Sequence, residues 1–268
     1  MTRKNADNIQ DDLDLILRKL DSIENYLHTP GGGVIHHINK ARADIINALA
    51  RHDYYNYSQI ESFLKLSFDG VLNYYPPFRG WALSPDLALV LRDYIIAYKP
   101  NKIIEFGCGA STVVLAKALR DAGKGSLVSI ENSNFHAAKT QKILDENFLS
   151  SWVEIIVSEI IDNDSISFNS KENVKFKWYD AEVLKKEGVL NYNYDLVLVD
   201  GPPGAICKNS RYPALPFLIN NLSDNAVIYL DDARREDERE ISEKWSSSYS
   251  FNHTFLNLDK GASLFERR

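Results

Sequence analysis

The chain has few of the residues that build metal clusters, disulfide frameworks and nucleic-acid-binding surfaces. Of its 268 residues, two are cysteine and one is methionine, and no CxxC pair is present. Two cysteines cannot form a tetrahedral four-cysteine site. No dense run of lysine and arginine occurs, and the formal net charge is −6. We therefore expect no nucleic-acid partner, because such binding depends on cations that neutralise phosphates.

The sequence also lacks a long apolar run. A membrane-spanning helix needs about 20 consecutive apolar residues, and no segment approaches that length. The polar first residues, MTRKNADNIQDDLDLIL, do not fit a secretory signal. We expect no membrane span and a cytoplasmic protein. Hydrophobic residues at 44% and charged residues at 25% are ordinary for a packed protein and exclude a disordered chain.

Residues 8–27 have the periodicity of an amphipathic helix. Apolar residues recur at spacings of 4, 3, 4, 3 and 4, the a/d alternation of a coiled coil, at Ile9, Leu13, Ile16, Leu20, Ile23 and Leu27. Two interpretations stay open: a self-association helix that makes a homo-oligomer, and an amphipathic helix that folds onto the body of its own chain. Pro30 and the glycines at 31–33 then predict a flexible joint.

The remaining chain changes character near Lys99. Before it, helices are expected at 38–51, 58–69 and from Ser84, with Ser84 as N-cap and Pro85 in the first turn. After it, short apolar strands at 102–106, 126–130, 152–157, 195–199 and 225–230 alternate with helices at about 111–122, 134–147, 213–221 and 235–246. This alternation predicts a parallel sheet covered on both faces. Apolar runs at 250–257 and 262–266, joined through Lys260-Gly261, predict a hairpin at the sheet edge.

The most informative segment is the turn from the first of these strands into its helix. The sequence from Ile103 to Thr112 is IIEFGCGAST. Gly107 and Gly109 allow the backbone to approach a ligand closely, and the helix N-terminus that follows supplies free N–H groups. Glu131 ends the next strand, where an acid can accept hydrogen bonds from the two hydroxyls of a ribose. Together these features predict a nucleoside-cofactor site.

The details of this loop decide which cofactor is expected. A dinucleotide-binding loop would have a third glycine at the position of Thr112. Instead an acid, Glu105, stands two residues before the first glycine, which is the first motif of the class I S-adenosylmethionine-dependent methyltransferases. The chain resembles this family from about Tyr74 to Arg268, and in particular bacterial methyltransferases associated with glycan biosynthesis. The shared patterns are RGWALSP at 79–85, RYPALP at 211–216, and DDAR at 231–234 followed by Trp245.

The resemblance implies a Rossmann-like, doubly wound, seven-stranded sheet that is mostly parallel with an antiparallel C-terminal hairpin, preceded by N-terminal helices. The expected divisions are an appendage at 1–30, a helical cover at 31–98 and a class I methyltransferase domain at 99–268. In the family, Glu105 organises the loop and Glu131 holds the ribose. The implied cofactor-binding residues are Glu105, Gly107, Cys108, Gly109, Ser111, Thr112, Glu131 and Asp200. Trp81 and Ser84 either close over the cofactor or are ordinary packing residues.

Three carboxylates are expected at the carboxyl ends of parallel strands, where open α/β sheets bind ligands. Asp200 follows DLVLV, and Asp231 and Asp232 follow AVIYL. By the resemblance, Asp200 faces the transferred methyl group or the substrate. The three could hold a hard cation such as Mg²⁺, or Asp200 or Asp232 could act as general base without a metal. Asp231 or Asp232 could also merely cap the next helix. Arg211 and Tyr212 are expected to contact a polyhydroxylated or anionic acceptor.

The sequence therefore predicts an S-adenosylmethionine-dependent methyltransferase that methylates oxygen on a glycan or small polar metabolite. Two alternatives stay open. An NAD-dependent oxidoreductase is disfavoured by Thr112 and by the terminal hairpin. A non-catalytic, methyltransferase-like adaptor would use the N-terminal helix to join an assembly.

Overall fold

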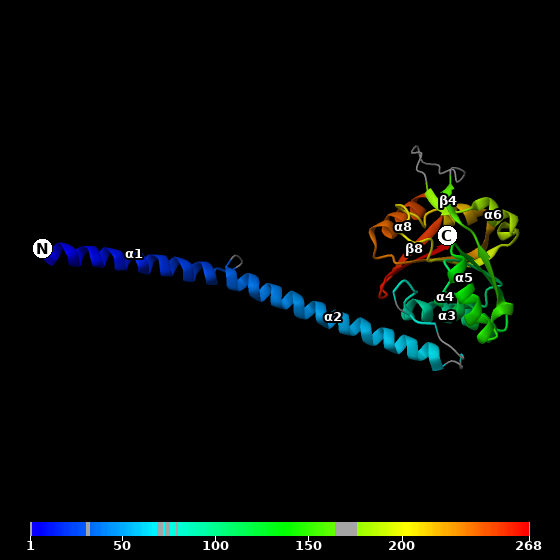
Figure 1. Ribbon diagram of the computed structural model, residues 1–268, viewed down its shortest axis with the longest axis horizontal. Coiled ribbons are helices and arrows are strands. Elements are labelled where there is room, and N and C mark those ends of the chain that lie inside the picture. Colours follow the sequence, from blue (N-terminus) through cyan, green and yellow to red (C-terminus); the bar gives the residue numbers. More distant parts are fainter. Residues whose placement is uncertain are drawn as a thin grey trace. The chain divides into compact units, whose positions relative to one another are not determined.

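The apolar strands after Lys99 assemble into one seven-stranded sheet in a computed structural model of the chain (Figure 1). The structure describes residues 2–30, 33–68, 72, 76–78, 80–163 and 176–267, with side chains described from residue 13 onward. The strand order is β3-β2-β1-β6-β7-β9-β8. These strands are β1 (Lys102–Phe106), β2 (Ser126–Glu131), β3 (Val153–Val157), β6 (Tyr194–Val199), β7 (Leu222–Asp231), β8 (Phe251–Leu256) and β9 (Ala262–Arg267).

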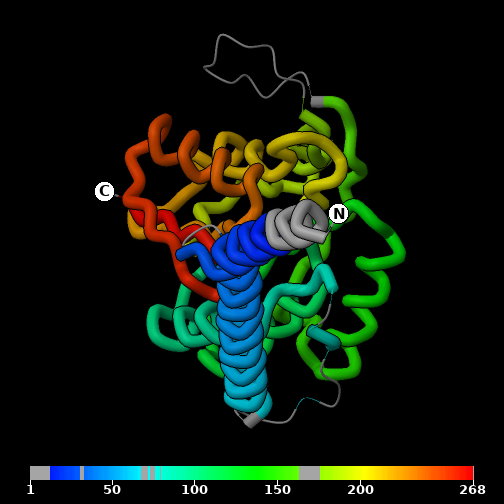
Figure 2. Tube along the Cα trace, turned by 90° about the vertical axis from the view of Figure 1, so that its left-hand side faces the viewer, coloured from blue at the N-terminus to red at the C-terminus, as the bar shows by residue number. Residues whose placement is uncertain are grey.

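Five of the strands run parallel, and the last two form the antiparallel hairpin that the sequence predicts. The strands β1, β2, β3, β6 and β7 pair in parallel, whereas β9 is antiparallel to both β7 and β8. The chain order reverses between β1 and β6, so the carboxyl ends of these two strands form the switch point where such sheets bind ligands. In Figure 2 the C-terminal elements, orange to red, lie toward one edge of this sheet and the green segment around α5 and β3 toward the other.

Alternate side chains of each central strand enter different hydrophobic cores, as a strand repeat of two residues requires. On β1, Ile103 lies in one core and Ile104 in the other, and Leu196 and Val197 divide in the same way on β6. Helices α3 (Pro85–Tyr98), α4 (Ala110–Ala122) and α5 (Asn134–Glu146) supply residues on one face, and α6 (Ala181–Lys186), α7 (Ala214–Leu218) and α8 (Glu236–Ser248) on the other. The result is the three-layer, Rossmann-like arrangement expected from the sequence.

The N-terminal helices differ from the expectation. Helix α1 (Thr2–His28) contains the predicted heptads, but the two helices expected at 38–51 and 58–69 are one continuous helix, α2 (Val34–Phe68). That expectation was wrong because residues 52–57, HDYYNY, contain no glycine or proline to interrupt the backbone hydrogen bonds. Two glycines of the predicted joint, Gly31 and Gly32, lie outside the described residues.

The chain divides into two compact units, Met1–Tyr57 and Ser58–Arg268, and the boundary falls within α2. In the second unit the end of α2 is anchored through Leu66, which is buried in the core between α3, α4 and the sheet. Gln59 contributes a polar anchor, because its Nε2 donates to Asp86 Oδ2 at 2.8 Å. The same Asp86 oxygen accepts from the backbone nitrogen of Asp259 at 2.8 Å. Asp86 thereby ties α2, α3 and the C-terminal hairpin together.

A second, small sheet has no counterpart in the sequence prediction. Strands β4 (Ile160–Asn163) and β5 (Phe176–Tyr179) pair antiparallel. Trp178 and Tyr179 of β5 are fully buried and extend the core beside Phe106. These short strands escaped prediction because only four residues of each carry the pattern.

Across the described part of the chain, none of the helices combines the length and the apolar character that crossing a membrane requires.

Candidate active site

Gly107 sets the geometry of the loop between β1 and α4. Its φ of 95° lies in the region that favours glycine. Its nitrogen donates to the Ile130 carbonyl oxygen at 2.8 Å, which holds the loop against the neighbouring strand β2. A Cβ at this position would lie 3.2 Å from the backbone of Asp200 and Gly201. The loop thus brings the ends of β1 and β6 together so closely that a larger residue would strain both.

Glu105 supports the loop from beneath. The side chain is fully buried at the end of β1. Its Oε2 accepts from Thr112 Oγ1 at 2.6 Å and from Ser129 Oγ at 2.8 Å. Thr112 Oγ1 accepts in turn from the nitrogen of Gly109 at 2.8 Å. Burial raises the pKa of Glu105 to about 7, although hydrogen bonds from Ser111, Thr112 and Ser129 oppose that rise.

Glu131 holds the other side of the same loop. Its Oε2 accepts from the backbone nitrogen of Cys108 at 3.0 Å, and its Oε1 accepts from that of Ser133 at 2.8 Å. Cys108 Sγ lies 3.5 Å from Thr140 Oγ1 on α5. Burial raises the pKa of the Cys108 thiol, so the sulfur stays protonated and is a poor nucleophile.

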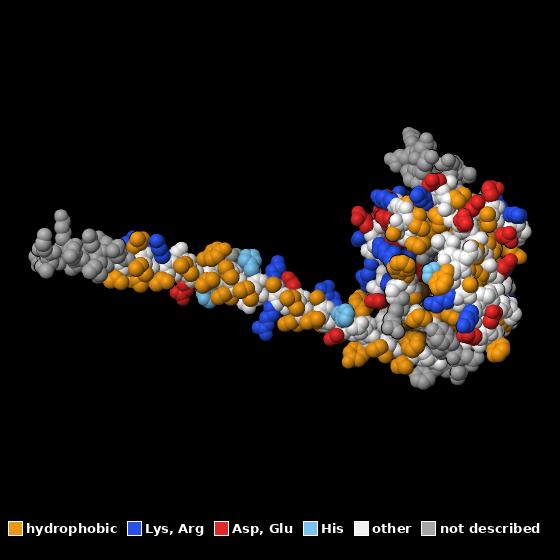
Figure 3. Space-filling model, in the orientation of Figure 1, with side chains coloured by type: hydrophobic (Ala, Val, Ile, Leu, Met, Phe, Trp, Pro, Cys, Tyr) orange, Lys and Arg blue, Asp and Glu red, His pale blue; other side chains and the backbone are white. Residues whose placement is uncertain are grey.

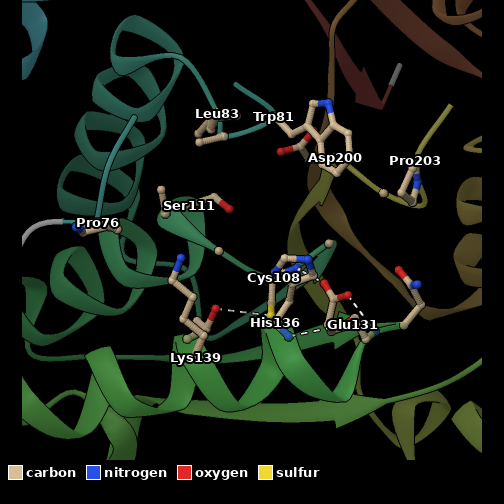
Figure 4. Close-up of a pocket in the computed structure, with 18 of the residues that line it drawn as sticks. Pro76, Trp81, Leu83, Cys108, Ser111, Glu131, His136, Lys139, Asp200 and Pro203 are labelled. Carbon is tan, nitrogen blue, oxygen red and sulfur yellow. Dashed lines mark hydrogen bonds between the residues drawn. The ribbon is translucent and has the colours of Figure 1, made fainter. Parts of the chain in front are cut away.

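A cavity of about 530 Å³ opens over this loop (Figure 4). Glu131, His136 and Cys108 lie at one end of it, and Trp81, Asp200 and Pro203 at the other. Gly107, Gly109 and Ser111 also line it, as do Leu83 and Lys139, which sequence reasoning missed. Its volume and its mixture of apolar walls and a few polar groups are typical of small-molecule sites.

A second cavity of about 500 Å³ shares Trp81, Asp200 and Pro203 with the first. The indole of Trp81 is 86% exposed at this junction. The remaining wall is strongly charged and consists of Arg211, Asp232, Arg235, Glu236, Asp237 and Glu238, with Gly204 and Ala205. The two cavities therefore meet at the carboxyl end of β6, where Asp200 stands.

The Arg211 guanidinium lies within the carboxylate cluster behind this junction. One nitrogen, Nη2, lies 3.2 Å from Asp200 Oδ1 and 3.0 Å from Asp232 Oδ2. The other, Nη1, donates to the Asp231 carbonyl oxygen at 3.1 Å and lies 3.6 Å from Glu238 Oε1. The Arg211 side chain is only 4% exposed. This arginine therefore pairs with carboxylates of its own chain while it also lines the second cavity, and its contact with an acceptor stays a prediction.

The three predicted carboxylates do come together. Oxygen atoms of Asp200, Asp231 and Asp232 all lie within 4.8 Å of one another. Asp232 has a φ of 59°, a conformation that costs a non-glycine residue free energy and that accumulates at functional sites. Burial and the charge of Asp231 raise the pKa of Asp200 well above its ordinary value. Burial and the charge of Asp232 raise the pKa of Asp231 to about 6.

These carboxylates fit a divalent cation only in part. Oxygen ligands are those that Mg²⁺ prefers, and both carboxylate oxygens of the buried Asp231 lack a hydrogen-bond partner within the described residues. However, Asp200 and Asp232 already bind Arg211, and Asp232 also pairs with Arg235 at 2.9 Å. A bound metal ion would have to compete with these guanidinium groups.

Five predicted site residues line neither cavity, and the buried Asp231 is one of them. Glu105 and Thr112 are buried beneath the loop, and Ser84 is buried where α3 begins. Tyr212 is a core residue, since its ring stacks on Phe176 and its carbonyl oxygen accepts from Trp245 Nε1 at 3.1 Å. Of the pair Trp81 and Ser84, only Trp81 reaches the cavities.

Lys260 is a positioning residue that sequence reasoning treated only as part of a turn. Its Nζ donates to the carbonyl oxygens of Gly80 at 3.1 Å and Ala82 at 2.7 Å. The C-terminal hairpin thereby holds the segment that carries Trp81. No local sequence pattern predicts this contact, because Lys260 and Gly80 lie 180 residues apart in the chain.

Both the sequence and the fold are similar to those of known methyltransferases. Residues 104–233 match a family model described as a methyltransferase domain. No curated protein matches the sequence. Among solved structures, a methyltransferase from Podospora anserina with S-adenosylhomocysteine bound is similar, with a TM-score of 0.55, 16% identity, and 86% of this chain and 97% of that chain covered.

Two O-methyltransferase structures are also similar. The enzyme from Bacillus cereus, in complex with S-adenosylhomocysteine, has a TM-score of 0.52 and 16% identity, covering 79% of this chain and 91% of that one. The enzyme from Streptomyces achromogenes, which is involved in tomaymycin synthesis and is in complex with S-adenosylmethionine, has a TM-score of 0.51 and 18% identity, covering 70% and 82%. At these identities the likeness shows the fold. The family match adds that residues 104–233 are similar in sequence to a methyltransferase domain.

The buried Glu105 predicts an unusual pH dependence of stability. Because its pKa is raised to about 7 from 4.5, the folded protein holds a proton that the unfolded chain releases between these values. Because of this carboxyl, the free energy of unfolding therefore falls as pH rises through that window, by up to about 1.4 kcal/mol per pH unit. We expect Glu105→Gln to reduce the decline measured by urea unfolding, while Glu243→Gln on the exposed surface leaves it unchanged. An unaltered slope in Glu105→Gln would contradict the assignment.

Proposed function

We propose that the protein is an S-adenosylmethionine-dependent O-methyltransferase. The observation that carries this proposal is the junction of the two cavities at Trp81, Asp200 and Pro203. One cavity has the loop and the acidic strand end suited to a nucleoside cofactor. The other has charged residues and the Trp81 side chain in its wall and reaches the same carboxylate. A methyl donor in the first would meet an acceptor in the second at Asp200.

The first cavity has groups suited to the cofactor. Glu131 has both carboxylate oxygens in bonds to backbone nitrogens, which orient the group while leaving acceptor capacity for ribose hydroxyls. The N-terminus of α4 and the loop from Gly107 to Ser111 lie against the same space. When bound, the cofactor would supply an activated methyl group on a positively charged sulfur. The carboxylates of Glu131 and Asp200 suit that charge.

Methyl transfer requires the acceptor oxygen to be aligned with the methyl carbon and to lose its proton. Alignment by a shaped site can supply a large share of the rate increase. We propose that Asp200 receives the proton of the acceptor hydroxyl as the new carbon–oxygen bond forms. The raised pKa of Asp200 makes its ionised form a better proton acceptor than an ordinary aspartate. Asp232 is the alternative base, although its Oδ2 already bonds both Arg211 and Arg235.

The charged wall of the second cavity indicates the class of acceptor. Carboxylates outnumber arginines there, and Arg211 and Arg235 are already paired with them. An anionic acceptor would face these carboxylates without a free cation on the described wall. Hydroxyl and amino groups can instead donate hydrogen bonds to carboxylates, and the exposed Trp81 indole offers an apolar face for a sugar ring. We therefore propose a neutral or amino-bearing polyhydroxylated acceptor, such as a glycan or a small polar metabolite.

Arg211 also bears on the metal alternative. Its guanidinium already supplies positive charge to Asp200 and Asp232. We therefore propose that Asp200 acts without a divalent cation. The alternative, a bound divalent cation, is supported by Asp231, because a metal ion would supply the partner that its buried carboxylate oxygens lack within the described residues. A binding measurement separates the two.

Cofactor binding is tested by calorimetry with S-adenosylhomocysteine. We expect wild type to bind, and Gly107→Arg to lose binding, because a side chain at φ 95° would also collide with the end of β6. Glu131→Gln should bind about 10-fold or more weakly, since hydrogen bonds to a charged acceptor contribute about 1.5–3 kcal/mol. Glu243→Gln is the matched surface control, and circular dichroism confirms folding. Equal binding by wild type and Glu131→Gln, or tighter binding of NAD, would refute the proposal.

The acceptor class is tested by transfer of a radiolabelled methyl group to neutral sugars, amino sugars, uronic acids and sugar phosphates. We expect label in the neutral or amino compounds at least 10-fold above the anionic ones, because the anions would face unneutralised carboxylates. Asp200→Asn should lose transfer while retaining S-adenosylhomocysteine affinity within a few-fold. Preferential labelling of the phosphates or uronic acids would overturn the assignment of the charged wall.

The metal question is tested with Mn²⁺ as a paramagnetic probe. If Arg211 is the cation of the cluster, titration followed by electron paramagnetic resonance should show no stoichiometric binding at micromolar Mn²⁺, and Asp200→Asn should behave as wild type does. Stoichiometric binding that Asp200→Asn weakens would establish the metal alternative.

A further inference from the structure

Helix α1 exposes most of the described part of its heptad core, and only Leu27 is partly buried. Leu13, Ile16, Leu20 and Ile23 are 48–55% exposed, and Figure 3 shows hydrophobic side chains along the N-terminal helices. Among the described residues of the first unit, no side chain is buried. An isolated helix in water has little stability of its own and usually depends on packing of its apolar face. The exposed apolar face of α1 therefore indicates that another helix packs against it.

The identities of the core residues indicate how many helices associate. With Leu13 at position a, every a position from 13 to 27 is leucine (Leu13, Leu20, Leu27), and every d position from 9 to 23 is isoleucine (Ile9, Ile16, Ile23). In parallel coiled coils, leucine at a with isoleucine at d shifts the preference from two strands to three or four. The next positions widen the apolar face, because Leu17 at e and Tyr26 at g are more than half exposed. A wide face is buried more fully by more strands.

The charges on the flanks indicate the orientation. Lys19 occupies a g position and Glu24 the e position of the following heptad. In a parallel, in-register coil these two positions of neighbouring helices face each other and form an interhelical ion pair. The helix is thus complementary to a second copy of itself in this orientation.

We propose that α1 assembles four copies of this chain into a parallel, in-register coiled coil. The apolar face continues on α2, where Ile38, Ile45 and Leu49 are more than half exposed, so copies of α2 can join the same assembly. The proposal concerns the first unit alone and does not depend on the proposed methyl transfer.

Association is tested on the full chain by sedimentation equilibrium and light scattering. We expect a mass of four times the 30.5 kDa protomer. The decisive variant exchanges leucine and isoleucine throughout the core: Ile9→Leu, Leu13→Ile, Ile16→Leu, Leu20→Ile, Ile23→Leu and Leu27→Ile. Its composition is unchanged, yet isoleucine at a with leucine at d favours two strands, so its mass should halve. A monomeric, dimeric or trimeric wild type would overturn the proposal, as would an exchange variant that remains tetrameric.

Orientation is tested by charge reversal. Lys19→Glu or Glu24→Lys alone should raise the concentration for half-dissociation several-fold, whereas the double variant Lys19→Glu/Glu24→Lys should restore the wild-type value. Arg18→Glu is the matched control, because it reverses a similar charge at an outward f position. Failure of the double variant to recover, or an equal effect of Arg18→Glu, would exclude the parallel pairing. Circular dichroism on each variant verifies that the chain folds.

Discussion

The buried guanidinium of Arg211 is the interaction on which the arrangement of the candidate site depends. It joins the carboxyl ends of β6 and β7 to α8 through Asp200, the carbonyl of Asp231, Asp232 and Glu238. A charge this deeply buried is tolerated only when paired and hydrogen-bonded, and removing one partner of such a pair typically costs about 3–5 kcal/mol. The carboxylates need the arginine equally, because four acids this close would otherwise repel one another. Strand ends, acids and arginine therefore form one unit.

The position of Trp81 depends on a different and more distant contact. Lys260, at the turn between β8 and β9, holds the carbonyl oxygens of Gly80 and Ala82 on either side of Trp81. Asp86 connects the same hairpin to α2 and α3 through Asp259 and Gln59. The antiparallel hairpin thus does more than close the sheet edge. It sets where the segment before α3 crosses the carboxyl edge of the sheet, and hence where the two cavities meet.

Much of the parallel sheet and of the nucleoside end of the site could be predicted from the sequence, because local patterns encode them. Gly107 stands where an apolar strand pattern passes directly into a helix pattern, which predicts a tight turn with positive φ. The position of Glu131 at the end of the next strand is predicted by the spacing of the two strands. Arg211 could not be assigned in this way. Its position in the sequence suggests contact with an acceptor, and only the folded chain shows that four acids from three elements surround it. The continuous α2 was missed for a related reason, since its polar middle resembles a connection although nothing there breaks a helix.

The two units obtain their stability in different ways. The second buries leucine, isoleucine and valine on both faces of its sheet, so its fold is explained within one chain. The first has regular heptads and no buried side chain among its described residues. Exposed leucine and isoleucine at a and d lack the stabilisation that burial of their side chains would give. The cofactor loop and the carboxylate cluster lie wholly in the second unit. Its chemistry therefore explains none of the pattern in α1, for which we propose a role in assembly.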